Sequence, residues 1–345
     1  MILTSQAQLE QCTLHVVGNR LREEGISLSK SLQSLTPENE RHLMHYFFSS
    51  FKYEELYTLA HDTELTYNEV YGFVSAIFED PACFYEQSVH LARHLYQQSM
   101  HPKIRKGELY IGYFKNCEVN GKRVDAVGLF KSENKDTFLK IRAGEGNFEI
   151  ESQQGVNINK LDKGCLIFNV EKESGYQVAI VDNINKGMEA KYWADDFLHI
   201  RRKQTDFAST SDMLSLFNGF VTTELPADYS KMDQAFLMNR SLEAMKRKKQ
   251  MNVTDLAEEV FQEPALAERF DQYKKEYEQK RDVTLPDSFE VSEQALKRKG
   301  RGTMQVIRLD RNFDLRIHGG EQFVEKGYDE ERGMHYYKLY FAEEK

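Results

Sequence analysis

Three side chains in the middle of the chain are of the types that a magnesium-dependent nuclease uses. Asp125, Glu133 and Lys135 form the pattern Asp-x7-Glu-x-Lys within a β-rich stretch. In such nucleases two carboxylates hold Mg²⁺, and the lysine stabilises or deprotonates the attacking water. The pattern is loose, and Glu133-Asn134-Lys135 also has the composition of a turn between two strands. We therefore interpret these residues as turn and surface chemistry and keep the nuclease as the weakest of three hypotheses.

Other patterns for metals and cofactors are weaker still. Glu86, His90 and His94 follow one another at four-residue steps, so they share one face of a predicted helix, as helical metal ligands do. We expect that face to be wet, and a solvated polar face explains the pattern without a metal. The sequence has no phosphate-binding glycine loop, no nucleophile elbow and no Cys-x-x-Cys motif. We expect no cofactor, no metal site and no catalytic residues, and therefore a protein that is not an enzyme.

Four groups of basic side chains remain as candidates for binding a polyanion. Such side chains neutralise phosphates, and each contact adds affinity that falls steeply with salt. At the end of a helix the same cations also complement the helix dipole and need no ligand. Because four groups recur in a chain of net charge −9, we favour one real polyanion surface. The candidate DNA-contacting residues are Lys131, Lys135, Lys140, Arg142, Arg201, Arg202, Lys203, Lys246, Arg247, Lys248, Lys249, Lys297, Arg298, Lys299 and Arg301.

The elements that position these residues come in helical and strand-rich blocks. The first hundred residues are mostly helical, and Thr36-Pro37 and Asp80-Pro81 each open a predicted helix with an N-cap and a proline. Strand candidates fill the stretch from Glu108 to Val181, where Asn120-Gly121 marks a tight hairpin. Because the connections are too short for parallel crossovers, we predict an antiparallel β-meander.

The second half of the chain returns to helices and then to strands. Apolar residues at three- and four-residue steps from Met232 to Met245 predict one long amphipathic helix. The predicted fold class is α+β: a helical N-terminal part, a central antiparallel β-meander, a second helical part and a C-terminal β-rich tail. We predict two domains. Residues 1–188 hold helices to about 100 and then the sheet, and residues 189–345 hold helices to about 285, then a short helix and strands.

Composition and charge indicate a cytoplasmic protein. The four cysteines are scattered, as in reduced proteins. The N-terminus lacks the pattern of a secretory signal, and no apolar run is long enough to span a bilayer, so we expect no membrane association. Residues 1–100 hold 6 basic against 13 acidic residues, so the acidity lies mainly at the front and later parts can still present positive faces.

The stretch Tyr113–Ile141, which contains Gly-Leu-Phe-Lys-Ser-Glu-Asn-Lys at 128–135, is similar to the bacterial nucleoid-associated protein family of the NdpA type. One further similar segment, Leu14-His15, precedes this stretch. Three others come after it, in the order Gly155–Asn159, Tyr192–Phe220 and Leu315–Gly319. The resemblance implies a DNA-associated, non-enzymatic cytoplasmic protein of the bacterial nucleoid. It implies no set of DNA-contacting residues, so the candidates above rest on charge alone.

Our leading hypothesis is a nucleoid-associated DNA-binding or DNA-maintenance protein that forms a homodimer. We expect it to contact mainly the phosphate backbone of duplex DNA, because the sequence has no evident recognition-helix motif for reading bases. The alternative is a protein-interaction adaptor that reaches the nucleoid through a partner protein. The net charge of −9 favours that alternative.

Overall fold

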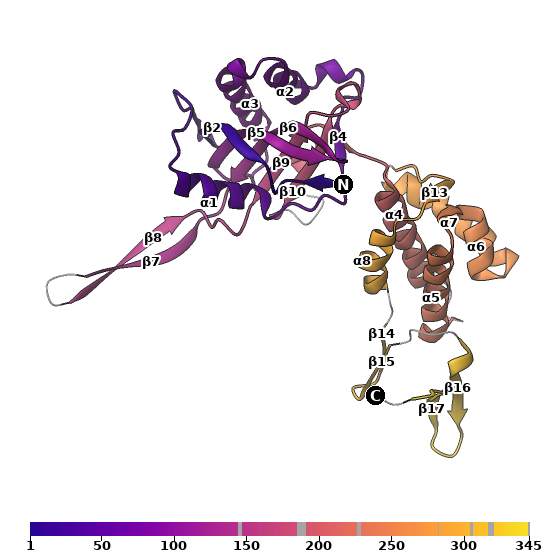
Figure 1. The fold of residues 1–345 in the computed structure, drawn as a ribbon. Helices are drawn as coiled ribbons and strands as arrows, with labels where there is room; N and C mark the ends of the chain where they lie inside the picture. The colour runs from indigo at the N-terminus through magenta and orange to yellow at the C-terminus, as the bar shows by residue number, and fades with distance from the viewer. Residues whose placement is uncertain are drawn as a thin grey trace. The chain divides into compact units, whose positions relative to one another are not determined.

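The computed structural model describes residues 1–143, 147–184, 191–225, 229–281, 283–303, 306–316 and 321–343. The chain divides into two compact units, residues 1–203 (unit 1) and residues 204–345 (unit 2) (Figure 1). The division lies after Lys203 rather than after residue 188, because Trp193, Phe197 and Leu198 are buried in the core of unit 1. The predicted α+β class is confirmed, and the described residues include eight α-helices.

Unit 1 is built on a nine-stranded antiparallel sheet with the order β11-β4-β10-β9-β6-β5-β2-β3, in which β1 also pairs with β5. The β5–β6 hairpin turns through Asn120 and Gly121, whose φ angles of 51° and 79° confirm the predicted turn. The strands of the sheet are β1 Ile2–Leu3, β2 Gln8–Val17, β3 Ile26–Ser27, β4 Tyr57–Leu59, β5 Gly107–Val119, β6 Lys122–Ser132, β9 Lys163–Phe168, β10 Gln177–Asp182 and β11 Ile200–Arg202.

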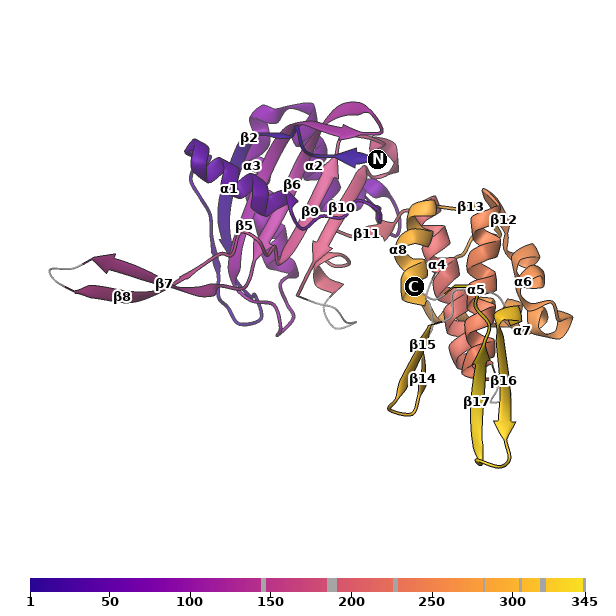
Figure 2. The same ribbon diagram turned by 60° about the horizontal axis from the view of Figure 1, so that its bottom comes forward.

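Helices cover both faces of this sheet (Figure 2). Helices α2 (Glu69–Glu79) and α3 (Phe84–Gln98) pack on one face, and α1 (Pro37–Phe48) packs on the other. Successive residues of a strand point to opposite faces, so Ile167 of β9 joins the core under α2 and α3 while Phe168 joins the core under α1. Burial on both faces explains why β9 is buried along its whole length.

The polar pattern on α3 lies only partly on a wet face, because the side chains of Glu86 and His90 are 72% and 41% exposed but that of His94 is not. His94 is buried at 5% exposure, and its Nε2 lies 3.1 Å from the carbonyl oxygen of Phe197. The prediction that this face is solvated is therefore wrong for His94, because the segment that follows residue 191 folds back over the helix. Across the described ranges, no group of three or more His, Cys, Asp or Glu side chains could hold a metal ion.

A second buried histidine makes the stability of unit 1 depend on pH. His15 of β2 is fully buried, with Nε2 3.2 Å from Ser88 Oγ and Nδ1 accepting from the backbone N–H of Ser29 at 3.1 Å. Burial lowers the pKa of His15 to about 4 from its ordinary value of 6.5. The unfolded chain therefore binds a proton between these two pH values that the folded chain does not bind.

Unit 1 is accordingly expected to lose up to about 3 kcal/mol of stability as the pH falls from about 6.5 to about 4. Urea unfolding followed by the fluorescence of the buried Trp193 measures this loss. Carboxylates titrate below about pH 5, so the comparison with a His15→Gln variant is made between pH 6.5 and 5. A variant that loses stability with pH as steeply as the parent would contradict the assignment to His15.

Strands β7 (Asp136–Ala143) and β8 (Phe148–Gly155) leave the sheet and form a two-stranded ribbon, which we call the arm (Figures 1 and 2). Strand β6 pairs directly with β9 in the sheet. The predicted meander is therefore confirmed for its other strands, but β7 and β8 are not part of the sheet. All eight residues of β7 are exposed. Apolar and polar side chains alternate along these strands. Within the described part of the chain, however, no element covers either face of the ribbon.

Unit 2 is a helical core with short strands. One cluster of buried residues joins all five helices, and the predicted apolar stripe from Met232 to Met245 is buried. Strand β12 pairs with β13, β14 with β15, and β16 with β17. The elements are α4 Asp206–Gly219, α5 Lys231–Arg247, α6 Val253–Phe261, α7 Pro264–Arg281, α8 Glu293–Thr303, β12 Gln250–Asn252, β13 Ser288–Glu290, β14 Val306–Leu309, β15 Phe313–Arg316, β16 Val324–Asp329 and β17 Met334–Leu339.

Short helical turns connect the longer elements. They are η1 Leu65–Tyr67, η2 Pro81–Cys83, η3 Lys172–Ser174, η4 Lys191–Trp193, η5 Phe220–Glu224 and η6 Glu321–Phe323. Residues 317–319 of the family-like segment Leu315–Gly319 lie outside the described residues. Among the helices that are described, none has both the length and the apolar character needed to cross a membrane.

Candidate nucleic-acid interface

The nuclease-like residues do not meet. Asp125 lies within β6 and accepts a hydrogen bond of 2.5 Å from the hydroxyl of Tyr113. Glu133 follows the end of the same strand, about 26 Å further on at about 3.3 Å per residue. Lys135 pairs with Glu108 instead of either carboxylate. Because one ion cannot bridge such a separation, the structure contradicts a magnesium site made by Asp125, Glu133 and Lys135.

Lys131 is not a DNA-contacting residue, and that prediction is wrong. Its side chain is fully buried, although its charge indicated a surface position. Its Nζ lies 2.9 Å from Glu133 Oε1 and 3.2 Å from the hydroxyl of Tyr192, and it also donates to the carbonyl oxygen of Arg105 at 3.0 Å. Burial lowers the pKa of Lys131, and the adjacent carboxylate of Glu133 opposes that shift. The ammonium is held inside unit 1 and cannot reach a phosphate.

Lys131 belongs to a largely buried polar network, which we call the anchor, and the ring of Tyr192, 5.1 Å from Lys163 Nζ, joins its two parts. Its members are Lys131, Glu133, Asp162, Lys163, Asp182 and Tyr192. Tyr192 donates to Glu133 at 2.5 Å, and Lys163 Nζ lies 2.7 Å from Asp182 Oδ2. Asp162 accepts from the backbone N–H groups of Glu133 and Asn134 at 2.6 and 2.7 Å. These two residues lead into β7, so the anchor fixes the base of the arm.

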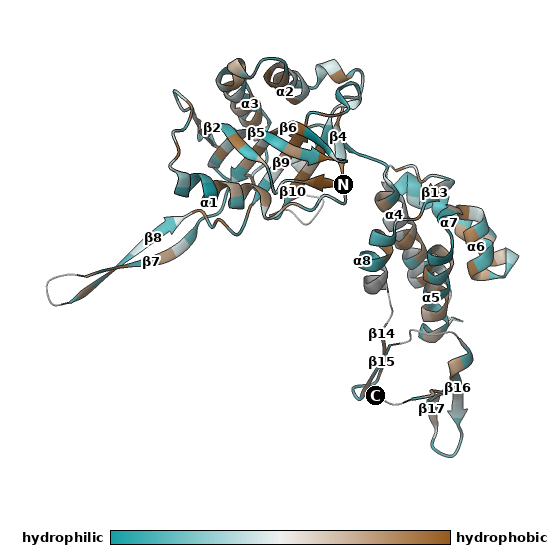
Figure 3. Ribbon diagram, viewed as in Figure 1, coloured by the Kyte–Doolittle hydropathy of each residue, from teal (hydrophilic) through white to brown (hydrophobic). Residues whose placement is uncertain are grey.

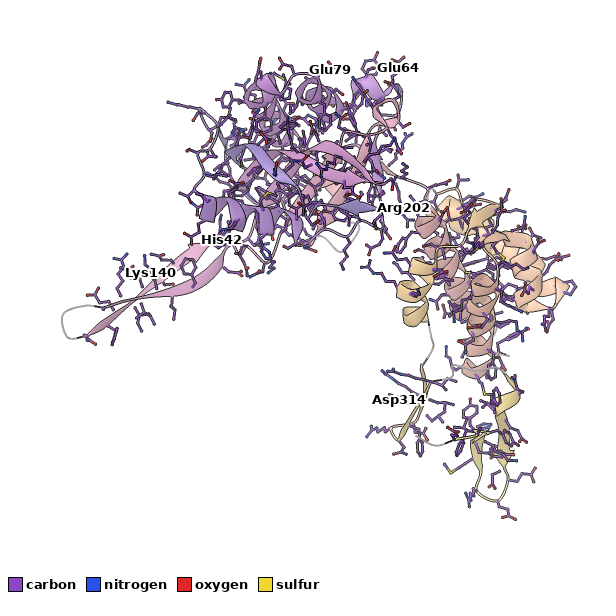
Figure 4. All side chains as sticks on the ribbon, viewed as in Figure 1. His42, Glu64, Glu79, Lys140, Arg202 and Asp314 are labelled. Carbon is purple, nitrogen blue, oxygen red and sulfur yellow. The ribbon has the colours of Figure 1, made fainter. Side chains whose placement is uncertain are left out.

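The exposed cations of the arm alternate with carboxylates. Lys140, which extends from the arm in Figure 4, lies opposite Glu151 in the strand register, and Arg142 lies opposite Glu149. Arg142 also forms an ion pair with Glu151 at 3.2 Å. Mixed signs of this kind give the arm no continuous positive stripe for a phosphate backbone.

The basic residues at β11 lie at the edge of the sheet, and each has an acidic partner. Arg201 pairs with Asp62 at 2.9 Å, and Arg202, labelled in Figure 4, pairs with Glu55 at 3.5 Å. Lys203 pairs with Glu171. Charged side chains on an edge strand oppose pairing with strands of other molecules, so these cations have a structural reason to be there.

The last two basic groups, which are far apart in the sequence, come together in unit 2. The end of α5, the turn into β12, the end of β13 and α8 surround a cavity of about 690 Å³, which we call the basic cleft. Apolar side chains contribute to its lining, among them Met245, Val291 and Leu296. The charged lining consists of five cations and two carboxylates, a net charge of +3: Lys246, Arg247, Lys248, Lys249, Lys297, Glu290 and Glu293.

Carboxylates hold most of these cations in the absence of a ligand. Glu259 binds Arg247 at 2.6 Å and Lys248 at 3.0 Å, and Lys246 pairs with Glu243 at 2.7 Å. Exposed pairs of this type contribute about 0–1 kcal/mol each, so a phosphate can replace the carboxylate at little cost. Lys249 has no carboxylate partner among the residues that the structure describes.

The remaining candidates lie on α8. Lys297 lines the basic cleft and pairs with Glu293 at 3.5 Å, whereas Arg298 and Lys299 lie on the same helix outside the cleft lining. The side chain of Arg301 lies outside the described residues. Sequence reasoning found both basic groups but missed the residues that join them. The pairing of β12 with β13 joins the two groups in the structure, and each of these strands has only three residues.

Comparison with known proteins identifies the family of this chain. A sequence model of the family described as nucleoid-associated protein YejK matches residues 13–333. The match therefore includes the anchor, the arm and the basic cleft. No curated protein sequence matches the chain. Because the family match covers nearly the whole chain, this protein belongs to the nucleoid-associated protein YejK family.

Proposed function

We propose that this protein binds duplex DNA directly, through the phosphate backbone, and that it does so at the bacterial nucleoid in the cytoplasm without catalysing a reaction. The observation that carries the proposal is the basic cleft, where five cations from two separate basic groups converge around two carboxylates. The chain as a whole carries a net charge of −9, so a local positive surface of this kind needs a reason beyond average composition.

The composition of the basic cleft favours contact with phosphates over the reading of bases. Its cations are four lysines and one arginine, and lysine is a flexible point charge that suits a phosphate. The amide side chains that read adenine do not occur among the described residues that line the cleft. Backbone contacts position a protein on DNA without sequence information, so we propose binding of low sequence specificity.

The test is the affinity of the full chain for a fluorescent DNA duplex, measured by anisotropy at several salt concentrations. Five cations that each neutralise one phosphate predict a slope of about −4.5 for log K against log salt. The affinity should then fall several hundredfold between about 50 and 200 mM salt. The absence of binding at the lowest salt concentration would overturn the proposal of direct contact.

A second candidate function is an adaptor that reaches the nucleoid through a protein partner. It is favoured by a cavity of about 650 Å³ between α6 and α7, which is lined by five carboxylates and one lysine. The charged lining residues are Glu258, Glu263, Glu268, Asp271, Asp287 and Lys274. Such a surface repels DNA and suits a basic protein segment. Purified protein that fails to bind DNA but co-purifies with a nucleoid enzyme would decide for the adaptor.

We also propose that two copies of the chain pair as a homodimer. Two basic clefts in one particle would engage one duplex together, and the second contact would benefit from a high effective concentration. Dimers with twofold symmetry are the commonest oligomers of soluble proteins.

A further inference from the structure

The arm has one apolar face that nothing in the described part of the chain covers. Leu139, Ile141, Phe148 and Ile150 are exposed at 66%, 65%, 71% and 67%. In the strand register Ile141 lies opposite Ile150, Leu139 opposite Ser152 and Ala143 opposite Phe148. Residues that lie opposite one another, or two positions apart, project to the same side of a ribbon. These four large apolar side chains therefore share one face, whereas Phe138 lies on the other, and Figure 3 shows apolar segments along the arm.

The other face of the arm carries the charged side chains, together with one large apolar side chain, Phe138, which is exposed at 48% and lies against Gly155. Lys140 and Arg142 lie opposite Glu151 and Glu149, and Arg142 pairs with Glu151 at 3.2 Å. A ribbon with one charged and one apolar face has the pattern of a sheet that packs against another layer. An isolated two-stranded ribbon is only marginally stable in water, so the apolar face needs a covering layer.

We propose that the apolar face of the arm packs against the same face of the arm in a second copy of the chain. This inference rests on the homodimer proposed above and names its surface. The face carries no charged side chain, because its other members are Thr137, Ser152 and Gln154. Two chains of net charge −9 can therefore meet there without placing like charges in contact.

The size of the face fits a small specific interface. Each of the four large side chains exposes roughly 120 Å², about two thirds of the area that such a residue can bury. One arm thus exposes about 500 Å² of apolar surface, which is near the upper end for patches on monomers. Covering it in both copies would bury about 1,000 Å² in total, near the lower bound for a specific protein–protein contact.

DNA is a poor alternative occupant of the arm. Its described residues carry two cations, Lys140 and Arg142, against three carboxylates, Asp136, Glu149 and Glu151. A ribbon of net negative charge does not attract a phosphate backbone. The anchor also favours pairing, because Asp162 holds the backbone of the two residues that lead into β7 and so limits the freedom of the arm at its base.

The experiment is sedimentation equilibrium of the full chain, alone and with two changes in the apolar face. The parent chain is expected to dimerise. The Ile141→Glu/Ile150→Glu variant is expected to raise the dimer dissociation constant at least about 100-fold, because four carboxylates would meet in the interface. Gln153→Glu, which adds a charge to the opposite face of the arm, is the matched control and should leave the constant unchanged. Unchanged fluorescence of Trp193 would show that unit 1 remains folded.

Mixing two variants tests whether the two faces meet. An Ile141→Lys/Ile150→Lys chain should also be monomeric alone but should form a one-to-one dimer with the Ile141→Glu/Ile150→Glu chain. A loss of folding would not give this rescue. A parent chain that stays monomeric would overturn both the homodimer and this inference. A dimer that survives both pairs of changes would overturn the arm as its surface while leaving the homodimer intact.

Discussion

Replacing Glu133 by alanine is expected to lower the free energy of unfolding of unit 1 by about 3–5 kcal/mol. The change leaves the fully buried ammonium of Lys131 without the carboxylate that lies 2.9 Å from it. It also removes the acceptor to which Tyr192 donates at 2.5 Å. A buried charge that loses its partner keeps its full desolvation cost, which is why the loss exceeds the value of one ordinary hydrogen bond.

Urea unfolding followed by tryptophan fluorescence measures this effect without interference from unit 2. Trp193 is the single tryptophan of the chain, is fully buried, and lies next to Tyr192 in the core of unit 1. Its signal therefore reports unit 1 alone.

Two further variants separate the buried charge from other causes. Lys131→Met combined with Glu133→Leu removes both charges and should recover most of the lost stability, because apolar replacement of a buried pair is often neutral or stabilising. Lys135→Ala breaks the partly exposed pair with Glu108 and should cost only about 0–1 kcal/mol. An unfolding midpoint for Glu133→Ala that equals that of Lys135→Ala would refute the role assigned to the anchor.

Local signals in the sequence were sufficient to place most elements of the fold. Asn120-Gly121 required a tight turn, Thr36 capped α1 as predicted, and the stripe from Met232 to Met245 became the buried side of α5. Each of these depends on residues within one or two turns of the chain. The arm could not be told from the sheet, because alternation in β7 and β8 shows that a face is apolar but not whether the same chain covers it.

The candidate site was predictable in composition but not in arrangement. Charge type placed Lys131 on the surface, but the fold buries it beside Tyr192, which lies 61 residues further along the chain. The groups at 246–249 and at Lys297 were both recognised, yet their convergence depends on the pairing of Met251 with Phe289 across β12 and β13. Contacts between distant segments follow from tertiary packing, which spacing in the sequence does not record.

Changing Lys246, Arg247, Lys248 and Lys249 together to alanine is expected to weaken binding to duplex DNA by up to about a thousandfold at about 0.1 M salt. Each of the four cations lines the basic cleft, and each neutralised phosphate contributes about 0.9 to the slope of log K against log salt. The slope should therefore fall by up to about 3.6 in magnitude. Alanine avoids the repulsion from Glu259 that glutamate at residues 247 and 248 would introduce.

The matched control changes Arg201, Arg202 and Lys203 to alanine. It removes three positive charges from unit 1, and the cleft variant removes four from unit 2. The control therefore reproduces most of the change in net charge. Because those three cations lie at a sheet edge of unit 1 and do not line the basic cleft, we expect less than about a threefold loss of affinity. Equal losses in the two variants would mean that net charge governs binding and that no cleft is used. If the cleft variant binds DNA with unchanged affinity, the basic cleft is not part of the DNA-binding surface. Only a large loss confined to that variant, with a smaller salt slope, assigns the phosphate contacts to the basic cleft.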